Sequence, residues 1–184
     1  MWIKKDVLNQ KHFEHMKNIV TDNRFPWYSM DSTAAHFRTV EYDQSFSHVL
    51  YCPEHSSDYF NMFYGTMWGG MASIGIDLNE ILRMRLGLIP RTELSHMHYP
   101  HVDFSYDHQT ALFCLSGNSG VTTFYNELDQ GEYHSWKRDP NTLTILNRVA
   151  PEENQMIVFD GHRYHCSSTP TTDVPRIMLN INYI

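Results

Sequence analysis

The sequence predicts a mostly β fold, either a sandwich or a jelly roll, with helices at its N-terminal end. Apolar residues recur at helical spacing only within 1–75, whereas short apolar and alternating segments fill 81–184. The 184 residues show no internal repeat and no linker rich in Gly, Ser or Pro. We therefore expect one domain over 1–184, with 1–75 as a helical and loop support and 81–184 as the jelly-roll core.

Two helices are expected in the N-terminal part. Apolar positions in 6–23 recur every three or four residues, and Asp6 is the expected N-cap. A second helical pattern covers 57–67 and is expected to stop at the glycine pair 69–70. The stretch between the helices is aromatic and irregular up to about residue 53, so we interpret it as loop.

Strands are expected from residue 81 onwards. Segment 81–89 alternates, with one face formed by Leu82, Met84, Leu86 and Leu88 and the other by Arg83, Arg85 and Gly87. Further strands are predicted at 94–103, 110–115, 121–125, 143–146, 156–160 and 176–183. Residues 116–120 are rich in turn formers, which indicates a hairpin between the strands on either side. Many short antiparallel strands are typical of a sandwich or jelly roll.

Composition excludes several classes of protein. The chain is 41% hydrophobic, which excludes fibrous and disordered proteins, and its net charge of −7 argues against extended binding to nucleic acid. The three cysteines are widely spaced and indicate neither a disulfide framework nor a structural zinc site. No run of 18 apolar residues and no signal-type segment occurs, so we expect a cytoplasmic protein without a membrane span.

The 12 histidines are unusually many for 184 residues, and a few of them lie at spacings that suit a metal. Residues i and i+2 of a strand project from the same face, so His101 and Asp103, at a predicted strand end, are suited to bind one cation. Residues 159–165 follow an apolar strand and offer His162 and His165, of which one is expected as a third ligand. Two histidines and one carboxylate leave three octahedral positions open, as in non-haem Fe(II) oxygenases.

The last predicted strand has one apolar and one polar face. Its polar face carries Arg176, Asn180 and Asn182. If this face turned into a barrel, Arg176 would be a buried cation that requires an anion, preferably a carboxylate held by its planar fork.

Several segments together resemble a known family. They are 99–104 (Tyr-Pro-His-Val-Asp-Phe), the strand 110–115 with its glycine-containing turn, Asn154 with 159–161, 164–165, 175–176 and 180–183. In this combination and order the chain resembles the Fe(II)/2-oxoglutarate-dependent dioxygenases over about 81–183. Among these enzymes it is most similar to the small prolyl-hydroxylase-like members of phage and marine-bacterial type.

The resemblance implies a double-stranded β-helix (jelly roll) in which His101, Asp103 and His165 hold Fe(II). The family's spacing favours His165 over His162, and it assigns Arg176 to the distal carboxylate of 2-oxoglutarate. The implied reaction uses 2-oxoglutarate and O2 to hydroxylate a C–H bond of an unidentified peptidyl or small-molecule substrate, with release of succinate and CO2. The resemblance also allows for ascorbate as an auxiliary reductant.

The sequence departs from the family pattern at one position, and it leaves open two alternative functions and one alternative role for a pair of arginines. Many prolyl-hydroxylase-like members carry a cosubstrate-binding tyrosine where this chain has Cys114, and Asn180 is the candidate substitute. A cupin-type metalloenzyme that does not use 2-oxoglutarate is one alternative function. A noncatalytic jelly-roll binding or structural module is another, and it predicts that His101, Asp103 and His165 lie far apart. Arg83 and Arg85 are expected on a solvated edge, with contact to an anionic substrate as the alternative.

Overall fold

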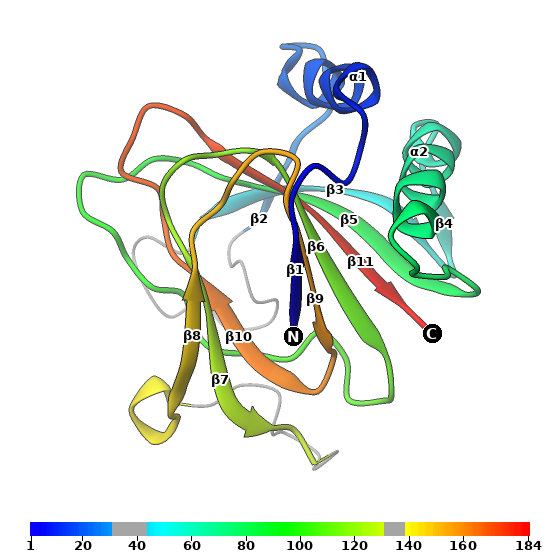
Figure 1. Cartoon of the computed structure of the whole chain (residues 1–184). Helices are drawn as coiled ribbons and strands as arrows, with labels where there is room; N and C mark the ends of the chain where they lie inside the picture. Colours follow the sequence, from blue (N-terminus) through cyan, green and yellow to red (C-terminus); the bar gives the residue numbers. More distant parts are fainter. Residues whose placement is uncertain (31–43, 131–138) are drawn as a thin grey trace.

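The computed structural model describes residues 1–30, 44–130 and 139–184, and these residues form two antiparallel sheets and two α-helices (Figure 1). The major sheet has the strand order β1 (Trp2–Lys4), β9 (Met156–Asp160), β6 (Gln109–Ser116), β11 (Arg176–Tyr183), β5 (Ile81–Ile89), β3 (Ser45–Cys52) and β2 (Tyr28–Met30), with β4 (His55–Ser56) paired to β3. The minor sheet has the order β10 (Arg163–Ser167), β7 (Thr122–Leu128) and β8 (Ile145–Val149), and a 3-10 turn at Pro140–Thr142 precedes β8. The predicted mostly β fold with N-terminal helices is confirmed.

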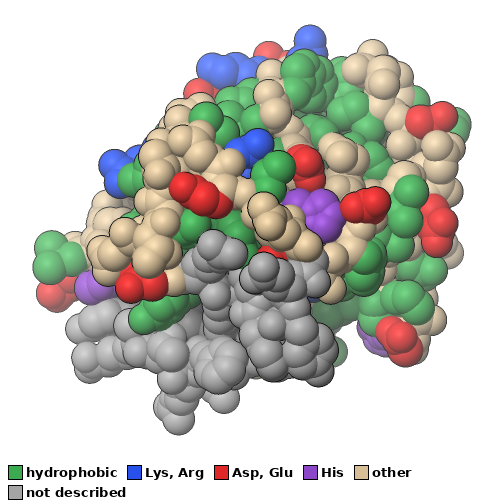
Figure 2. All heavy atoms as spheres, turned by 90° about the horizontal axis from the view of Figure 1, so that it is seen from below, with side chains coloured by type: hydrophobic (Ala, Val, Ile, Leu, Met, Phe, Trp, Pro, Cys, Tyr) green, Lys and Arg blue, Asp and Glu red, His purple; other side chains and the backbone are tan. Residues whose placement is uncertain are grey.

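The described surface carries many acidic groups. Figure 2 shows Asp and Glu side chains spread over the face seen from below, in keeping with the net charge of −7. Among the described residues, no helix combines the length and the apolar character that crossing a membrane requires.

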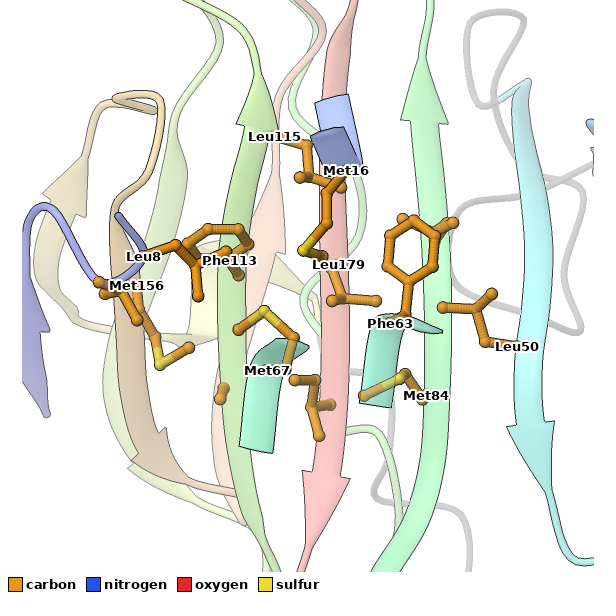
Figure 3. Packing of buried hydrophobic residues seen from close by; sticks show 14 of the residues in the cluster. Leu8, Met16, Leu50, Phe63, Met67, Met84, Phe113, Leu115, Met156 and Leu179 are labelled. Atoms are coloured by element: carbon orange, nitrogen blue, oxygen red, sulfur yellow. The ribbon is translucent and has the colours of Figure 1, made fainter. Parts of the chain in front are cut away.

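The main hydrophobic core lies between the helices and one face of the major sheet (Figure 3). Helix α1 (Gln10–Thr21) contributes Met16, and α2 (Phe60–Ser73) contributes Phe63 and Met67, all fully buried. These side chains pack with residues from the central strands, namely Met84, Phe113, Leu115 and Leu179. Each fully buried side chain of this size contributes about 1.5–3 kcal/mol of transfer free energy. The other face of these central strands, away from the helices, is therefore available for functional side chains.

The alternation predicted for the last strand is confirmed. Ile177, Leu179 and Ile181 of β11 lie in the core beneath the helices. Arg176 and Asn180 point the other way and line a cavity between the two sheets. Strands β5, β9 and β11 have the predicted bounds, while β6 and β7 are slightly longer than predicted and β8 is shifted toward the C-terminus.

The start of α1 and the end of α2 differ from expectation. Helix α1 begins after Asn9, whose side chain accepts a hydrogen bond from the His12 backbone N–H at 3.0 Å, so Asp6 is not the N-cap. Helix α2 continues through the glycine pair 69–70 to Ser73. Gly75, two residues after the end of the helix, has a positive φ of 82°, which suits glycine and forms part of a Schellman motif. The backbone N–H of Ile76 completes this motif by donating to the Met71 carbonyl at 2.9 Å.

Three further expectations were wrong. The strands on either side of 116–120 do not form a hairpin, because β6 lies in the major sheet and β7 in the minor sheet. Segment 94–103 is not a strand, and only Met97 and His101 form isolated bridges. The expectation of helix and loop alone in 1–75 missed β1 to β4, including the eight-residue β3 inside the major sheet. Residues 31–43 of the predicted loop lie outside the described part of the chain.

Candidate active site

Three predicted metal ligands meet between the two sheets. His101 lies in the segment between β5 and β6, whereas His165 lies in β10. One nitrogen of each histidine and one carboxylate oxygen of Asp103 all lie within 4.8 Å of one another. The scatter predicted for a module with incidental histidines is not observed.

A pair of backbone hydrogen bonds brings the two histidines together. The His101 N–H donates to the His165 carbonyl at 2.9 Å, and the His165 N–H donates to the His101 carbonyl at 3.0 Å. The imidazole rings lie side by side, with centroids 4.7 Å apart. The sequence interpretation placed His101 and Asp103 at the end of a regular strand. In the structure, His101 instead lies at an isolated antiparallel bridge to His165.

The hydrogen bonds of both rings fix one tautomer. Nδ1 of His101 lies 3.1 Å from the Tyr99 carbonyl oxygen, and Nδ1 of His165 lies 3.1 Å from the Arg163 carbonyl oxygen. A carbonyl oxygen only accepts, so each Nδ1 carries the proton and donates it. Each Nε2 then keeps a free lone pair, the usual arrangement of a metal-binding histidine.

Burial keeps both imidazoles neutral. Loss of solvent is the largest effect on His101, and together with the neighbouring His165 it lowers the pKa of His101 to about 3. Burial is likewise the largest effect that lowers the pKa of His165. Neutral imidazole is the form that binds metal, so no proton has to leave these two rings before a cation enters.

Asp103 is held as a carboxylate by a network of donors. Arg83 Nη2 donates to Oδ1 at 2.7 Å, while the side-chain amides of Asn180 and Asn182 donate to Oδ2 at 3.0 and 2.9 Å. Burial, the largest single effect, would raise the pKa of Asp103, but the positive charge of Arg83, together with that of Arg85, holds the pKa well below its usual range. The group is therefore an anion at neutral pH.

Arg176 lies in the same cavity and is 2% exposed. Its Nη1 donates to the Val121 carbonyl at 3.1 Å and its Nη2 donates to Thr122 Oγ1 at 2.6 Å. Its Nε has no hydrogen-bond partner, and no acidic group of the described residues pairs with it. Burial lowers the pKa of Arg176 to about 10, so the side chain is still a cation at neutral pH. A buried cation in this setting calls for an anionic ligand.

The cavity has a volume of about 100 Å³. His101, His165, Arg176 and Asn180 supply polar groups, and Thr122 adds a hydroxyl beside Arg176. Apolar side chains complete the wall: Met30, Phe46, Leu88, Ile89, Leu112 and Met178. A small, mostly apolar pocket with convergent polar groups is the usual form of a small-molecule site.

The remaining candidates lie elsewhere or have other contacts. Cys114 is buried outside the cavity wall, with its Sγ 3.7 Å from the Ser116 carbonyl oxygen. Asn180 lies in the wall, but its amide donates to Asp103 and makes no hydrogen bond to Arg176. His162 lies apart from the cluster and its Nε2 is 2.9 Å from Asp107 Oδ1. Of the two candidate histidines, His165 is the one that meets His101 and Asp103.

Sequence reasoning missed several polar residues of the site. Arg83 and Arg85 were expected on a solvated edge, yet Arg83 pairs with Asp103 and Arg85 lines the cavity. Asn182, which is fully buried, and Thr122 were not considered as contacts of Asp103 and Arg176. The alternation of β5 could have found the two arginines, since the residues opposite an apolar core face turn into a barrel as readily as into solvent.

No protein-family model and no curated protein sequence matches the chain. Solved structures do match, among them a Trichoplax adhaerens prolyl hydroxylase in complex with a peptide of hypoxia inducible factor (TM-score 0.66, 12% identity, 100% of this chain and 82% of that chain). A Pseudomonas putida prolyl-4-hydroxylase matches with TM-score 0.60 and 11% identity over 99% of this chain and 91% of that one. The non-haem α-ketoglutarate-dependent epimerase SnoN from nogalamycin biosynthesis matches with TM-score 0.64 and 13% identity over 99% and 77%. The chain thus has the jelly-roll fold of the 2-oxoglutarate-dependent Fe(II) oxygenases, prolyl hydroxylases included.

Proposed function

We propose that this protein is an Fe(II)- and 2-oxoglutarate-dependent dioxygenase that hydroxylates a C–H bond of a peptidyl or small-molecule substrate. The observation that carries the proposal is a cavity lined by two neutral histidines and a buried arginine, with a carboxylate close to both histidines. His101, Asp103 and His165 form the candidate metal site, and Arg176 is the buried cation. Neither half of this arrangement has a simple structural explanation without its ligand.

The donor set fits Fe(II). Two imidazole nitrogens and one carboxylate oxygen suit a borderline divalent metal, and three protein ligands leave octahedral positions for other molecules. Both histidines already present their Nε2 lone pairs, because each Nδ1 is engaged by a backbone carbonyl. The unpartnered Nε of Arg176 fits the distal carboxylate of 2-oxoglutarate.

The chain's own residues bind and orient the reactants. Fe(II), together with 2-oxoglutarate and O2, supplies the oxidising chemistry that converts C–H to C–OH and releases succinate and CO2. Arg176 grips the distal carboxylate, while Thr122 and the Val121 carbonyl fix the direction of its guanidinium. The apolar wall, which includes Leu112 and Met178, keeps water away from the reacting centre.

The cupin alternative has less support. A cupin-type metalloenzyme without 2-oxoglutarate has no need for a buried arginine that faces the metal ligands. Arg176 is buried and shares its cavity with His101 and His165. This placement favours an enzyme that binds a carboxylate next to its metal.

Anaerobic addition of Fe(II) and 2-oxoglutarate tests metal, cosubstrate and open coordination together, through the visible charge-transfer band of the chelate. We expect the band in the wild type and its loss, with loss of iron binding, in His101→Ala and Asp103→Ala. Arg176→Met should still bind iron but bind 2-oxoglutarate about 10-fold more weakly or worse. Arg91→Met removes an exposed arginine and should match the wild type. An absent band, or unchanged cosubstrate affinity in Arg176→Met, would contradict the proposal.

We also propose that the protein acts in the cytoplasm. Cys52, Cys114 and Cys166 are all free thiols in the structure. Reduced cysteines suit a compartment where disulfides are rare. Fractionation of cells that produce the chain with an internal tag would test this location.

A further inference from the structure

A second arginine faces the cavity that holds Arg176. Arg85 of β5 lines this cavity, and its Nε is inaccessible to solvent without a hydrogen-bond partner. Within 1–30, 44–130 and 139–184 its side chain forms no ion pair. Burial, reinforced by the charge of Arg83, lowers the pKa of Arg85 to about 10, which leaves it cationic at neutral pH.

The two arginines stand at different ends of the cavity. In the sheet, Arg85 pairs with Asn180 and Arg176 pairs with Ile89. Four residues of β11 separate the two positions, which corresponds to about 13 Å along the strand. Asn180 contacts Asp103, so Arg85 lies level with the metal ligands, while Arg176 lies beyond them.

The reactants of the proposed function provide no negative charge that would balance the charge of Arg85. The three positive charges of Fe(II) and Arg176 are balanced by the two carboxylates of 2-oxoglutarate and by Asp103. Arg83 and Arg85 add further positive charge. Arg83 donates to Asp103 and is 20% exposed, so water helps to solvate it. Arg85 forms no ion pair with a described acidic group, although the charge of Asp103 acts on it, and its Nε has no access to water.

Open space and unpaired polar atoms lie next to Arg85. Gly87 is the next residue of β5 on the same face, and a Cβ placed there would meet nothing within 4 Å. Ser47 pairs with Gly87 across the sheet, and its buried Oγ has no hydrogen-bond partner, like Oδ1 of Asn180. This part of the cavity therefore has room for a group with both acceptor and donor atoms.

We propose that Arg85 binds a carboxylate of the substrate, so that the substrate class is a carboxylate-bearing molecule. That the bound molecule is the substrate rests on the proposed function, whereas the carboxylate site at Arg85 does not. A guanidinium offers two parallel N–H donors to a carboxylate, and in a buried site such a pair is both strong and selective. Ser47 donates from its Oγ to the same carboxylate or to a neighbouring oxygen of the substrate.

Propionate, titrated calorimetrically into protein saturated with 2-oxoglutarate, is the probe, and uncharged propionamide is its control. We expect propionate but not propionamide to bind, and binding to weaken about 10-fold or more in Arg85→Met. Arg85→Lys keeps the charge without the planar fork, so its affinity for propionate should fall between those of the wild type and Arg85→Met. It also provides a second variant if Arg85→Met does not fold. Arg91→Met makes the same charge change at the surface and should bind propionate like the wild type.

Ligand-free stability separates a binding role from a structural one. Arg85 is half-buried and its shielded Nε has no hydrogen-bond partner. Because an unpaired, partly buried cation destabilises the fold, Arg85→Met should raise the Tm of the ligand-free protein, whereas loss of a structural arginine would lower it. Added propionate should raise the Tm of the wild type but not of Arg85→Met.

Three outcomes would overturn the inference. The first is propionate binding that is equal in wild type and Arg85→Met. The second is weaker 2-oxoglutarate binding in Arg85→Met with no propionate bound, which would assign Arg85 to the cosubstrate. The third is binding of methyl phosphate in place of propionate, which would change the substrate class. If 2-oxoglutarate itself fails to bind, the proposed function fails, but the Arg85-dependent propionate site can still be measured in an Arg176→Met background.

Discussion

Asn182 and Asp103 lie 79 residues apart and are joined by a hydrogen bond of 2.9 Å from the amide nitrogen of Asn182 to Oδ2 of the carboxylate. The same amide nitrogen donates to Thr110 Oγ1 at 3.0 Å, and the amide oxygen accepts from Arg83 Nε at 3.1 Å. Asn182 is fully buried. It therefore fixes both the carboxylate that faces the candidate metal and the arginine that pairs with this carboxylate.

Asn182→Ala should weaken binding of Fe(II) or Mn(II) by about 10–100-fold, the usual cost of losing a residue that orients a metal ligand. The reason is that Asp103 would lose one of its donors and Arg83 would lose the acceptor that aligns it. Metal titration by calorimetry under anaerobic conditions measures the effect. Asn61→Ala, at an exposed position of α2, is the matched control. An Asn182→Ala protein that folds and binds metal like the wild type would contradict the assigned role.

Thr122→Val should weaken binding of 2-oxoglutarate about 10-fold, because a hydrogen bond to a charged group contributes about 1.5–3 kcal/mol. The change keeps the shape of the side chain but removes the hydroxyl that accepts from Arg176 at 2.6 Å. Thr122→Ser restores the hydroxyl and should restore most of the affinity. Metal affinity should stay the same in both variants, since Thr122 does not belong to the ligand cluster. Equal cosubstrate affinity in Val and Ser variants would show that the hydroxyl has no part in aligning Arg176.

The strands that the sequence predicted best have one face in the main core. In β5 and β11 apolar residues alternate without a break, because one side of each strand packs beneath the helices. The same alternation assigned Arg176 to the opposite face, and the cavity lies there. His101, Asp103 and His165 were selected from spacing and from family resemblance, and the structure brings all three together.

The elements that were missed have polar residues inside or lie in irregular segments. β3 places Ser45 and Ser47 toward the cavity, so its pattern lacks the apolar alternation that indicates a buried strand. Arg85 was assigned to solvent for the same reason, since charge usually indicates an exposed face. His101 is positioned by a single bridge to His165. No local sequence pattern predicts a contact between segments so far apart in the chain.

Two glycines should respond to alanine in opposite directions. Gly69 lies within α2, where a Cβ would meet nothing within 4 Å, so Gly69→Ala should raise the free energy of unfolding by about 0.5–1 kcal/mol. Gly120 has a φ of 75°, and a Cβ there would lie 2.6 Å from the Ser168 carbonyl oxygen. Gly120→Ala should therefore lower the free energy of unfolding by about 1–3 kcal/mol. Urea denaturation measures both changes. Destabilisation by Gly69→Ala would contradict the observed path of α2 through the glycine pair.

The three free cysteines should differ in reactivity toward iodoacetamide. Only thiolate reacts, and burial, the largest effect in each case, raises the pKa of Cys114 to about 12 and also raises the pKa of Cys166. At mildly alkaline pH these two side chains therefore remain thiols, and they are also shielded from the reagent. Cys52 at the end of β3 is partly exposed.

Mass spectrometry of the folded protein should accordingly find label on Cys52 alone, with all three cysteines labelled in guanidinium. A moderate rise in pH should leave Cys114 and Cys166 unlabelled, because the solution pH stays below their raised pKa values. The site variant Arg176→Met provides a further check, since the charge of Arg176 acts to lower the pKa of Cys114. Its removal should leave Cys114 at least as unreactive as in the wild type. Rapid labelling of Cys114 in either folded protein would mean that solvent reaches its side chain in β6, and would contradict the burial of Cys114.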